Sequence, residues 1–119
     1  MCELELFIEQ IKTNPEIIEF QTTIDIIDKY YYYHATRFLN GPHNDNIINN
    51  AGENEGSCKI FSFAQIHQLN VTQTLHCFGQ FYRHDVLNYP ENTNHANIRT
   101  FMKYGWNNIT FDNQALKRK

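Results

Sequence analysis

The residues best suited to chemistry lie in one short run, Gly52–Lys59, which reads Gly-Glu-Asn-Glu-Gly-Ser-Cys-Lys. Polar residues and two glycines lead into Ser57, and a periodic apolar segment follows at once. This pattern predicts a loop that delivers a helix capped by Ser57, with Cys58 and Lys59 in its first turn. Because such a helix end carries free N–H groups and positive partial charge, it favours an anion.

The run differs from a phosphate-binding P-loop, which needs four residues between its glycines and a lysine directly after the second glycine. Here three residues intervene, and Ser57 and Cys58 precede Lys59. Two interpretations therefore stay open. One is a looser anion site built from helix N–H groups and Lys59, and the other is a structural loop that only caps its helix.

A small enzyme is the alternative class of function for the same run. A helix N-terminus lowers the pKa of a first-turn thiol, so Cys58 is a candidate nucleophile with Lys59 nearby. A nucleophilic cysteine needs a base, and His43 or His95 could serve if the fold brings either one close. The catalytic candidates are thus Cys58 and His95, and the opposing interpretation of Cys58 is a small buried side chain.

A second polar concentration combines Tyr82-Arg83-His84-Asp85 with Asn97 and Arg99. A salt bridge from Asp85 to Arg99 would link two helices. Alternatively, Arg83 and Arg99 would close the far side of one polar pocket over the helix start. Its rim would be Asn54, Lys59 and either His43 or His95. Its ligand would be a carboxylate or a phosphate. The binding candidates are Asn54, Ser57, Lys59, Arg83, Asp85, His95 and Arg99.

Metal binding is a third class, because the chain has six histidines. None stands at the HxxxH, HExxH or CxxC spacing of a metal site, although distant His43, His84 and His95 could assemble one. We predict no metal and no cofactor.

Composition limits the remaining choices. The 119 residues, 41% of them hydrophobic, predict one domain over 1–119. The net charge of −3 argues against nucleic acid as a partner. We expect no membrane span and no signal peptide, since no long apolar run or basic leader occurs. An odd count of three cysteines suits a reducing compartment. The many asparagines, among them Asn49 and Asn50, are interpreted as loop residues without a specific role.

Hydrophobic spacing predicts the elements that position these residues. A helix over 3–12 and a second one from Pro15 to Asp28, capped by Asn14, would form an αα-hairpin. An aromatic strand over 30–38 and a polar loop over 40–56 follow. Further helices are expected from Ser57, from a Thr72 cap to Val86, and from an Asn94 cap to Tyr104, where Gly105 ends the helix in the left-handed conformation.

The last part of the chain predicts a β piece over 109–111 and a final helical turn, capped by Asp112, that carries Leu116. A lone strand leaves backbone groups unpaired, so 109–111 should pair with 30–38. The fold class is therefore α+β, mostly α, with five or six short helices and a minor two-stranded antiparallel pair.

Short segments in order along nearly the whole chain form a recognisable signature: Phe38-Leu39-Asn40-Gly41, Asn50-Ala51-Gly52, Gly56-Ser57-Cys58-Lys59-Ile60-Phe61, Cys77-Phe78-Gly79, Tyr82-Arg83, Asp85-Val86-Leu87, Asn97-Ile98-Arg99 and Gly105-Trp106. Together they resemble the HopJ type III effector family. Extra residues separate His43 from Asn49-Asn50-Ala51-Gly52, so the match of His43 to the loop histidine of that family stays open.

The resemblance implies a bacterial protein with no known catalytic activity, delivered into a host cell by type III secretion. The first residues favour the bacterial cytoplasm instead, because Glu3 and Glu5 are acidic and lie in a predicted helix, whereas type III leaders tend to be disordered and poor in acidic residues. The function expected is a small binding or interaction module, whose partner is a small anion or a host or bacterial protein.

Overall fold

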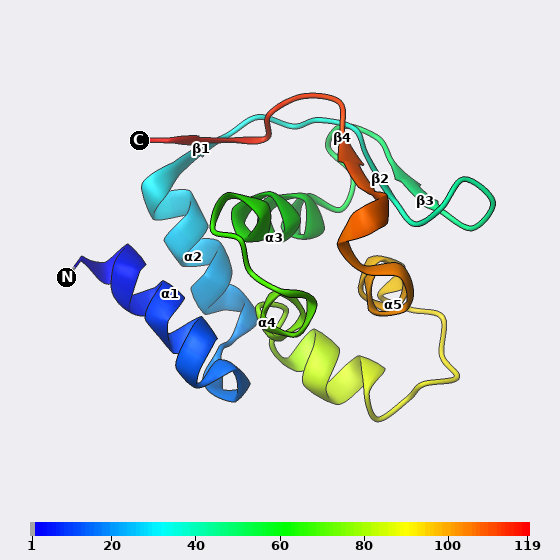
Figure 1. The fold of residues 1–119 in the computed structure, drawn as a ribbon, viewed down its shortest axis with the longest axis horizontal. Coiled ribbons are helices and arrows are strands. Elements are labelled where there is room, and N and C mark those ends of the chain that lie inside the picture. Colours follow the sequence, from blue (N-terminus) through cyan, green and yellow to red (C-terminus); the bar gives the residue numbers. More distant parts are fainter. Residues whose placement is uncertain (1) are drawn as a thin grey trace.

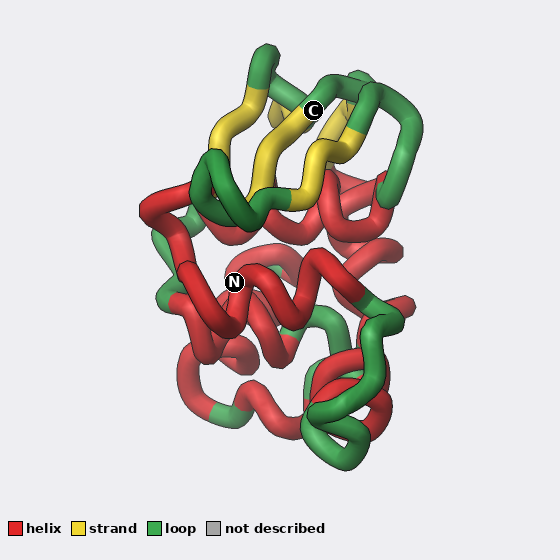
Figure 2. The backbone as a smooth tube through the Cα atoms, turned by 90° about the vertical axis from the view of Figure 1, so that its right-hand side faces the viewer, coloured by secondary structure: helices red, strands yellow, loops and turns green. Residues whose placement is uncertain are grey.

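Helices form the body of the molecule, and two small sheets lie on one side of it (Figures 1 and 2). The computed structural model describes residues 2–119. The helical segments are α1 (Glu3–Thr13), η1 (Pro15–Ile17), α2 (Phe20–Tyr30), α3 (Glu55–Ile66), α4 (Val71–His76), the π-helical η2 (Phe81–Val86), α5 (Ala96–Tyr104) and η3 (Gly105–Asn108). The strands are β1 (Tyr31–Tyr33), β2 (Phe38–Asn40), β3 (Ile47–Asn49), β4 (Ile109–Phe111) and β5 (Leu116–Arg118).

The predicted class, α+β and mostly α, is confirmed. Strand β2 lies between β3 and β4, and both pairings are antiparallel. Phe38 is opposite Phe111 in the β2–β4 register, which is the pairing expected between 30–38 and 109–111. The segment 30–38 is nevertheless not one strand. Tyr30 still belongs to α2, and β1 pairs with β5 in a separate sheet.

Two other sequence expectations about the sheets are wrong. Leu116 lies in β5 opposite Tyr33, not in a helical turn capped by Asp112. The physical reason is that β1 needs a partner for its backbone groups, and the C-terminal segment supplies one. The loop over 40–56 also contains β3, which forms a hairpin with β2.

The expected αα-hairpin is present, and an ion pair between Lys29 and Glu3 at 3.3 Å joins the end of α2 to the start of α1. The second helix does not run from Pro15 without interruption, because the chain makes the short η1 and becomes extended at Glu19 before α2 begins. Likewise the helix expected up to Val86 ends after His76. There Gly79 turns the chain at a φ of 59°.

Three predicted helix caps are displaced. Asn54, not Ser57, is the N-cap of α3, in the left-handed conformation that asparagine tolerates. Asn70, not Thr72, caps α4, and its side chain forms a capping box with Gln73. His95, not Asn94, is the N-cap of α5.

An aromatic cluster centred on Phe61 of α3 holds helices and sheet together. Its ring centroid lies 4.9 Å from that of Phe101, 5.5 Å from Phe78 and 6.1 Å from Phe38. These four rings are at most 2% exposed. Since they come from α3, α5, the segment before η2, and β2, they fix the start of α3 relative to α5, which positions the site described next.

Within residues 2–119, no helix has the length and apolar character needed to cross a membrane.

Candidate functional site

A cavity of about 310 Å³ opens where the first turns of α3 and α5 meet the start of α2 and of η2. Its polar half contains Asn54, Ser57, His95 and Asn97, together with the backbone of Gly56. Its apolar half is made by Phe20, Ile47, Phe78, Phe81, Ala96 and Ile98. The sequence predicted a pocket at the start of α3 with Asn54 and either His43 or His95 on its rim, and the cavity contains Asn54 and His95. The sequence did not predict that the first turn of α5 also lines it.

Two helix N-termini converge on this cavity. Gly56 and Ser57 belong to the first turn of α3, and Ala96, Asn97 and Ile98 form the first turn of α5. Neither helix has a side-chain cap at its N-terminus. First-turn N–H groups have no acceptor within their own helix, so donors from both helices are directed at this region. The positive ends of the two helix dipoles add to each other here.

His95 is held in place on the cavity wall by Asp85. Its Nε2 lies 2.9 Å from Asp85 Oδ2, while Nδ1 of His84 lies 2.9 Å from Asp85 Oδ1. The hydrogen bonds from His84 and His95 lower the pKa of the Asp85 carboxyl group. On the other side, the ring of Phe81 packs against the His95 ring, with centroids 5.1 Å apart. Within residues 2–119, Nδ1 of His95 makes no hydrogen bond.

A network of buried asparagine amides supports the polar half of the cavity. The Oδ1 atom of Asn49 accepts hydrogen bonds from Nδ2 of Asn54 at 2.7 Å and of Asn97 at 2.8 Å. Asn40 Nδ2 donates to the Asn97 backbone carbonyl at 2.9 Å. Asn40 and Asn49 are fully buried, and Asn97 is 6% exposed. The network therefore ties β2 and β3 to the start of both helices.

The interpretation of the asparagines as loop residues without a specific role is wrong for Asn49, which lies in β3 and is buried. Sequence reasoning missed the network, although a signal existed. Asn40 and Asn49 end two short apolar strand segments, where a polar side chain needs a partner if it is buried.

Lys59 does not line the cavity. Its Nζ lies 2.9 Å from Asp28 Oδ1 and 5.0 Å from the centre of the Tyr33 ring, on the side of α3 that faces α2 and β1. The predicted pocket with Lys59 on its rim is therefore not the cavity that the structure has, and any role of Lys59 in binding stays a prediction.

Cys58 is 1% exposed, and burial raises the pKa of its thiol. Within residues 2–119 it makes no hydrogen bond to a histidine or a carboxylate. A nucleophile needs both access and a base, and Cys58 has neither.

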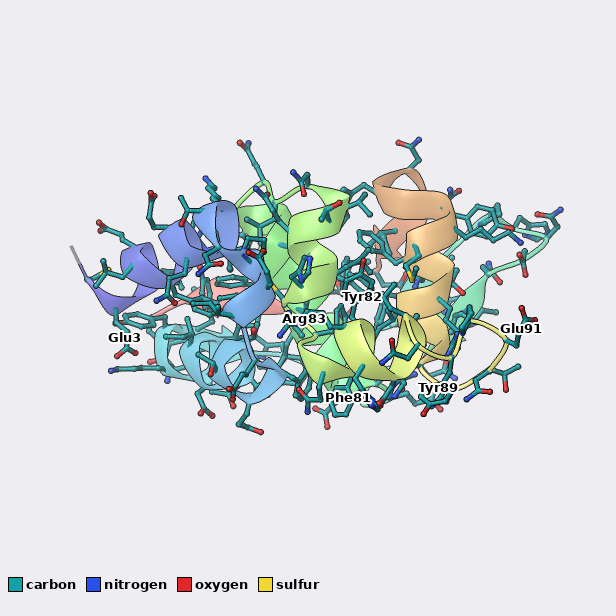
Figure 3. All side chains as sticks on the ribbon, turned by 90° about the horizontal axis from the view of Figure 1, so that it is seen from below. Glu3, Phe81, Tyr82, Arg83, Tyr89 and Glu91 are labelled. Atoms are coloured by element: carbon teal, nitrogen blue, oxygen red, sulfur yellow. The ribbon has the colours of Figure 1, made fainter. Side chains whose placement is uncertain are left out.

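The two arginine candidates bind backbone carbonyls. Arg83 donates to the carbonyls of Pro15, Ile18 and His76, so it joins η2 to the connection between α1 and α2 (Figure 3). Arg99 donates to the backbone carbonyls of Asn94 at 2.6 Å and of Tyr89 at 3.0 Å, both in the connection before α5. The expected salt bridge from Asp85 to Arg99 is wrong, since Asp85 contacts two histidines.

His43 is exposed in the turn between β2 and β3 and does not line the cavity. Among residues 2–119, no group of three or more histidine, cysteine or carboxylate side chains is arranged to hold a metal ion.

The fold and the cavity define a small, mostly helical α+β domain with a half-polar pocket at paired helix N-termini. The HopJ type III effector protein family matches residues 4–116, and the chain belongs to that family. The crystal structure of VPA0580, described as a protein of unknown function, superposes with a TM-score of 0.94 at 46% identity, covering 99% of this chain and 95% of that one. No curated protein matches the chain.

Proposed function

We propose that this protein is a small binding module whose cavity accepts a small anion, a carboxylate or a phosphate. The observation that supports the proposal is the convergence of the α3 and α5 N-termini on one cavity. A single helix end carries roughly half a positive charge, and its amides are oriented before the ligand arrives. Two ends at one cavity offer an anion more donors than it could obtain from either helix alone.

Side chains of the cavity complement these amides. The Ser57 hydroxyl and the His95 ring border the same space, and Asp85 orients the ring. The buried asparagines hold Asn54 and Asn97 in place, so little conformational entropy is lost when a ligand binds. Asp85 contacts the His95 ring and does not line the cavity.

A binding role is favoured over the enzyme alternative by the state of the two proposed reactive groups. Cys58 is buried with a raised pKa, and Lys59 is paired with Asp28 away from the histidines near the cavity. We therefore propose no catalytic residue.

The proposal is tested by NMR titration of the protein with inorganic phosphate and with acetate. We expect the amide signals of Gly56, Ser57, Ala96, Asn97 and Ile98 to move together, with one dissociation constant. Thermal-shift measurements in the same series should show stabilisation by mass action. If no anion moves these five amides, or if the shifts are spread over the surface, the cavity is not an anion site.

Two variants sharpen this test. His95→Asn keeps a residue type that tolerates a positive φ but removes the ring, so the affinity should fall several-fold. Lys59→Ala is the matched control, because Lys59 lies outside the cavity and its loss should leave the affinity unchanged. Loss of binding in Lys59→Ala with retention in His95→Asn would place the anion elsewhere.

We further propose that the protein works in the bacterial cytoplasm. Cys2, Cys58 and Cys77 are all unpaired in the structure, which suits a reducing compartment. The family's description as type III effectors makes delivery into a host cell the competing location. A reporter enzyme that is activated only in host cytosol, fused to the full chain, distinguishes the two. Type III-dependent reporter activity would overturn the cytoplasmic assignment.

A further inference from the structure

The anion proposed above would occupy only the polar half of the cavity. The remaining lining is apolar, and its largest members are Phe20 of α2 and Phe81 of η2. Both rings are only partly buried. Partly exposed aromatic surface inside a concave site is covered when an apolar ligand group enters, and that burial is favourable.

These rings form one continuous aromatic wall. Phe20 and Phe81 meet edge to face, with centroids 4.9 Å apart and planes at 68°. Phe81 in turn packs against His95, whose plane is inclined by only 34°. At the other end, a Cβ atom placed on Gly56 would lie 3.0 Å from Phe20 Cζ, so this ring touches the first turn of α3. The wall therefore runs from one helix N-terminus to the other.

The size of the cavity points in the same direction. A volume of about 310 Å³ is at the lower end of sites for small organic ligands and exceeds what one phosphate or acetate fills. A ligand with an anionic head at the amides and a flat body along the wall would use both halves. Ring faces and edges are the surfaces on which another ring packs best.

We infer that the ligand of this cavity is an aromatic carboxylate, with its carboxylate at the N-termini of α3 and α5 and its ring against Phe81 and Phe20. The inference rests on the proposed function, since it keeps the anion site and adds the class of ligand.

The test compares four probes by isothermal titration calorimetry on the full chain: phenylacetate, cyclohexylacetate, acetate and 2-phenylethanol. Phenylacetate should bind at least about tenfold more tightly than acetate, because part of a phenyl ring is removed from water. Cyclohexylacetate should bind more weakly than phenylacetate, because its saturated ring has no aromatic face to pack against Phe81 and Phe20. 2-Phenylethanol, which has the ring but no charge, should bind more weakly than phenylacetate.

The outcomes separate this inference from the proposed function. If acetate moves the five cavity amides and phenylacetate binds no more tightly, the aromatic class is wrong and the anion site stands. Equal binding of cyclohexylacetate and phenylacetate also overturns the aromatic class. If no carboxylate binds, the inference is wrong, and the anion site stands only if phosphate moves the five amides. If 2-phenylethanol binds as tightly as phenylacetate, both the inference and the anion site are wrong.

A pair of variants on η2 adds a matched control. Phe81→Leu keeps an apolar side chain against Phe20 but removes the ring, so phenylacetate should lose most of its advantage while the affinity for acetate is kept. Tyr82→Leu is the matched control, because the Tyr82 ring does not line the cavity and extends from a different side of η2 (Figure 3). This variant should bind phenylacetate like the wild type. Equal losses in both variants would contradict the inference.

If Phe81→Leu does not fold, as its melting curve would reveal, the wild type still gives an answer. Bound phenylacetate should shift the ring protons of Phe81 and His95 through its ring current, and acetate should not. Unmoved ring protons at saturating phenylacetate would overturn the inference.

Discussion

Asn54 and His95 share one backbone conformation and one place in the fold. Their φ angles are 50° and 54°, and each residue directly precedes a helix whose first turn lines the cavity. Neither side chain caps its own helix, because Asn54 donates to Asn49 and His95 contacts Asp85. The first-turn amides of α3 and α5 are thus not occupied by the cap side chains that helices usually provide.

The amide network that holds these two residues should contribute measurably to stability. Asn97→Ala removes the Oδ1 acceptor of Asn40 and Asn49 and the Nδ2 donor to Asn49, while Asn40 keeps its hydrogen bond to the backbone carbonyl of residue 97. We expect the free energy of unfolding to fall by about 2–3 kcal/mol. Urea unfolding measures this, with exposed Asn92→Ala as the control, which should change by less than about 0.5 kcal/mol. Equal effects of the two variants would show that the network is not stabilising.

Replacement by alanine should destabilise the protein by different amounts at two glycines with positive φ, Gly105 and Gly79. Gly105 has φ 67° and ψ −155°, which is a glycine conformation but not the left-handed helical one predicted, and a Cβ there would only touch Val71 at 3.4 Å. Gly105→Ala should cost about 1–2 kcal/mol of backbone strain. Gly79→Ala should cost more, since its Cβ would also overlap the backbone of Phe20. Thermal unfolding of both variants gives the order, and the reverse order would contradict this account.

The three thiols should divide into one reactive and two protected groups. Cys2 is exposed, whereas Cys58 and Cys77 are at most 1% exposed. Burial raises the pKa of the Cys77 thiol to about 12, which suppresses the thiolate that reacts. Titration with a thiol reagent should count one fast group in the native protein and three after unfolding without reductant. Fewer than three would reveal a disulfide.

His67 should make stability depend on pH. Burial, with Lys12 and Arg118 nearby, lowers the pKa of His67 below its ordinary value. As the pH falls below about 6.5, the unfolded chain takes up this proton before the folded one, so the free energy of unfolding decreases until the folded pKa is reached. His67→Gln should flatten the decline in urea unfolding between pH 7 and pH 5. Exposed His43→Gln should leave it unchanged, and an identical slope in both variants would exclude His67 as the cause.

Local pattern predicted much of this fold. Apolar residues spaced three and four apart defined the first two helices and the one that contains Phe61, because a helix that packs on a core must bury one face. The expected pairing of 30–38 with 109–111 followed from the requirement that a strand find a partner, and it holds at Phe38, although the strand that pairs runs over 38–40. Short segments in order along the chain also resemble the HopJ family, whose match over residues 4–116 confirms this prediction.

What the sequence by itself determined, then, was the fold class, the family and a polar helix start near Ser57. The tertiary structure alone decided which distant groups meet. It buried Cys58, paired Lys59 with Asp28, and placed the N-terminus of α5, with His95 held by Asp85, opposite that of α3. The physical reason is that these contacts join residues of different elements, 10 positions apart for Asp85 and His95 and 31 for Asp28 and Lys59, and packing of the Phe61 cluster sets their geometry. Spacing within a helix or strand specifies only which residues share a face.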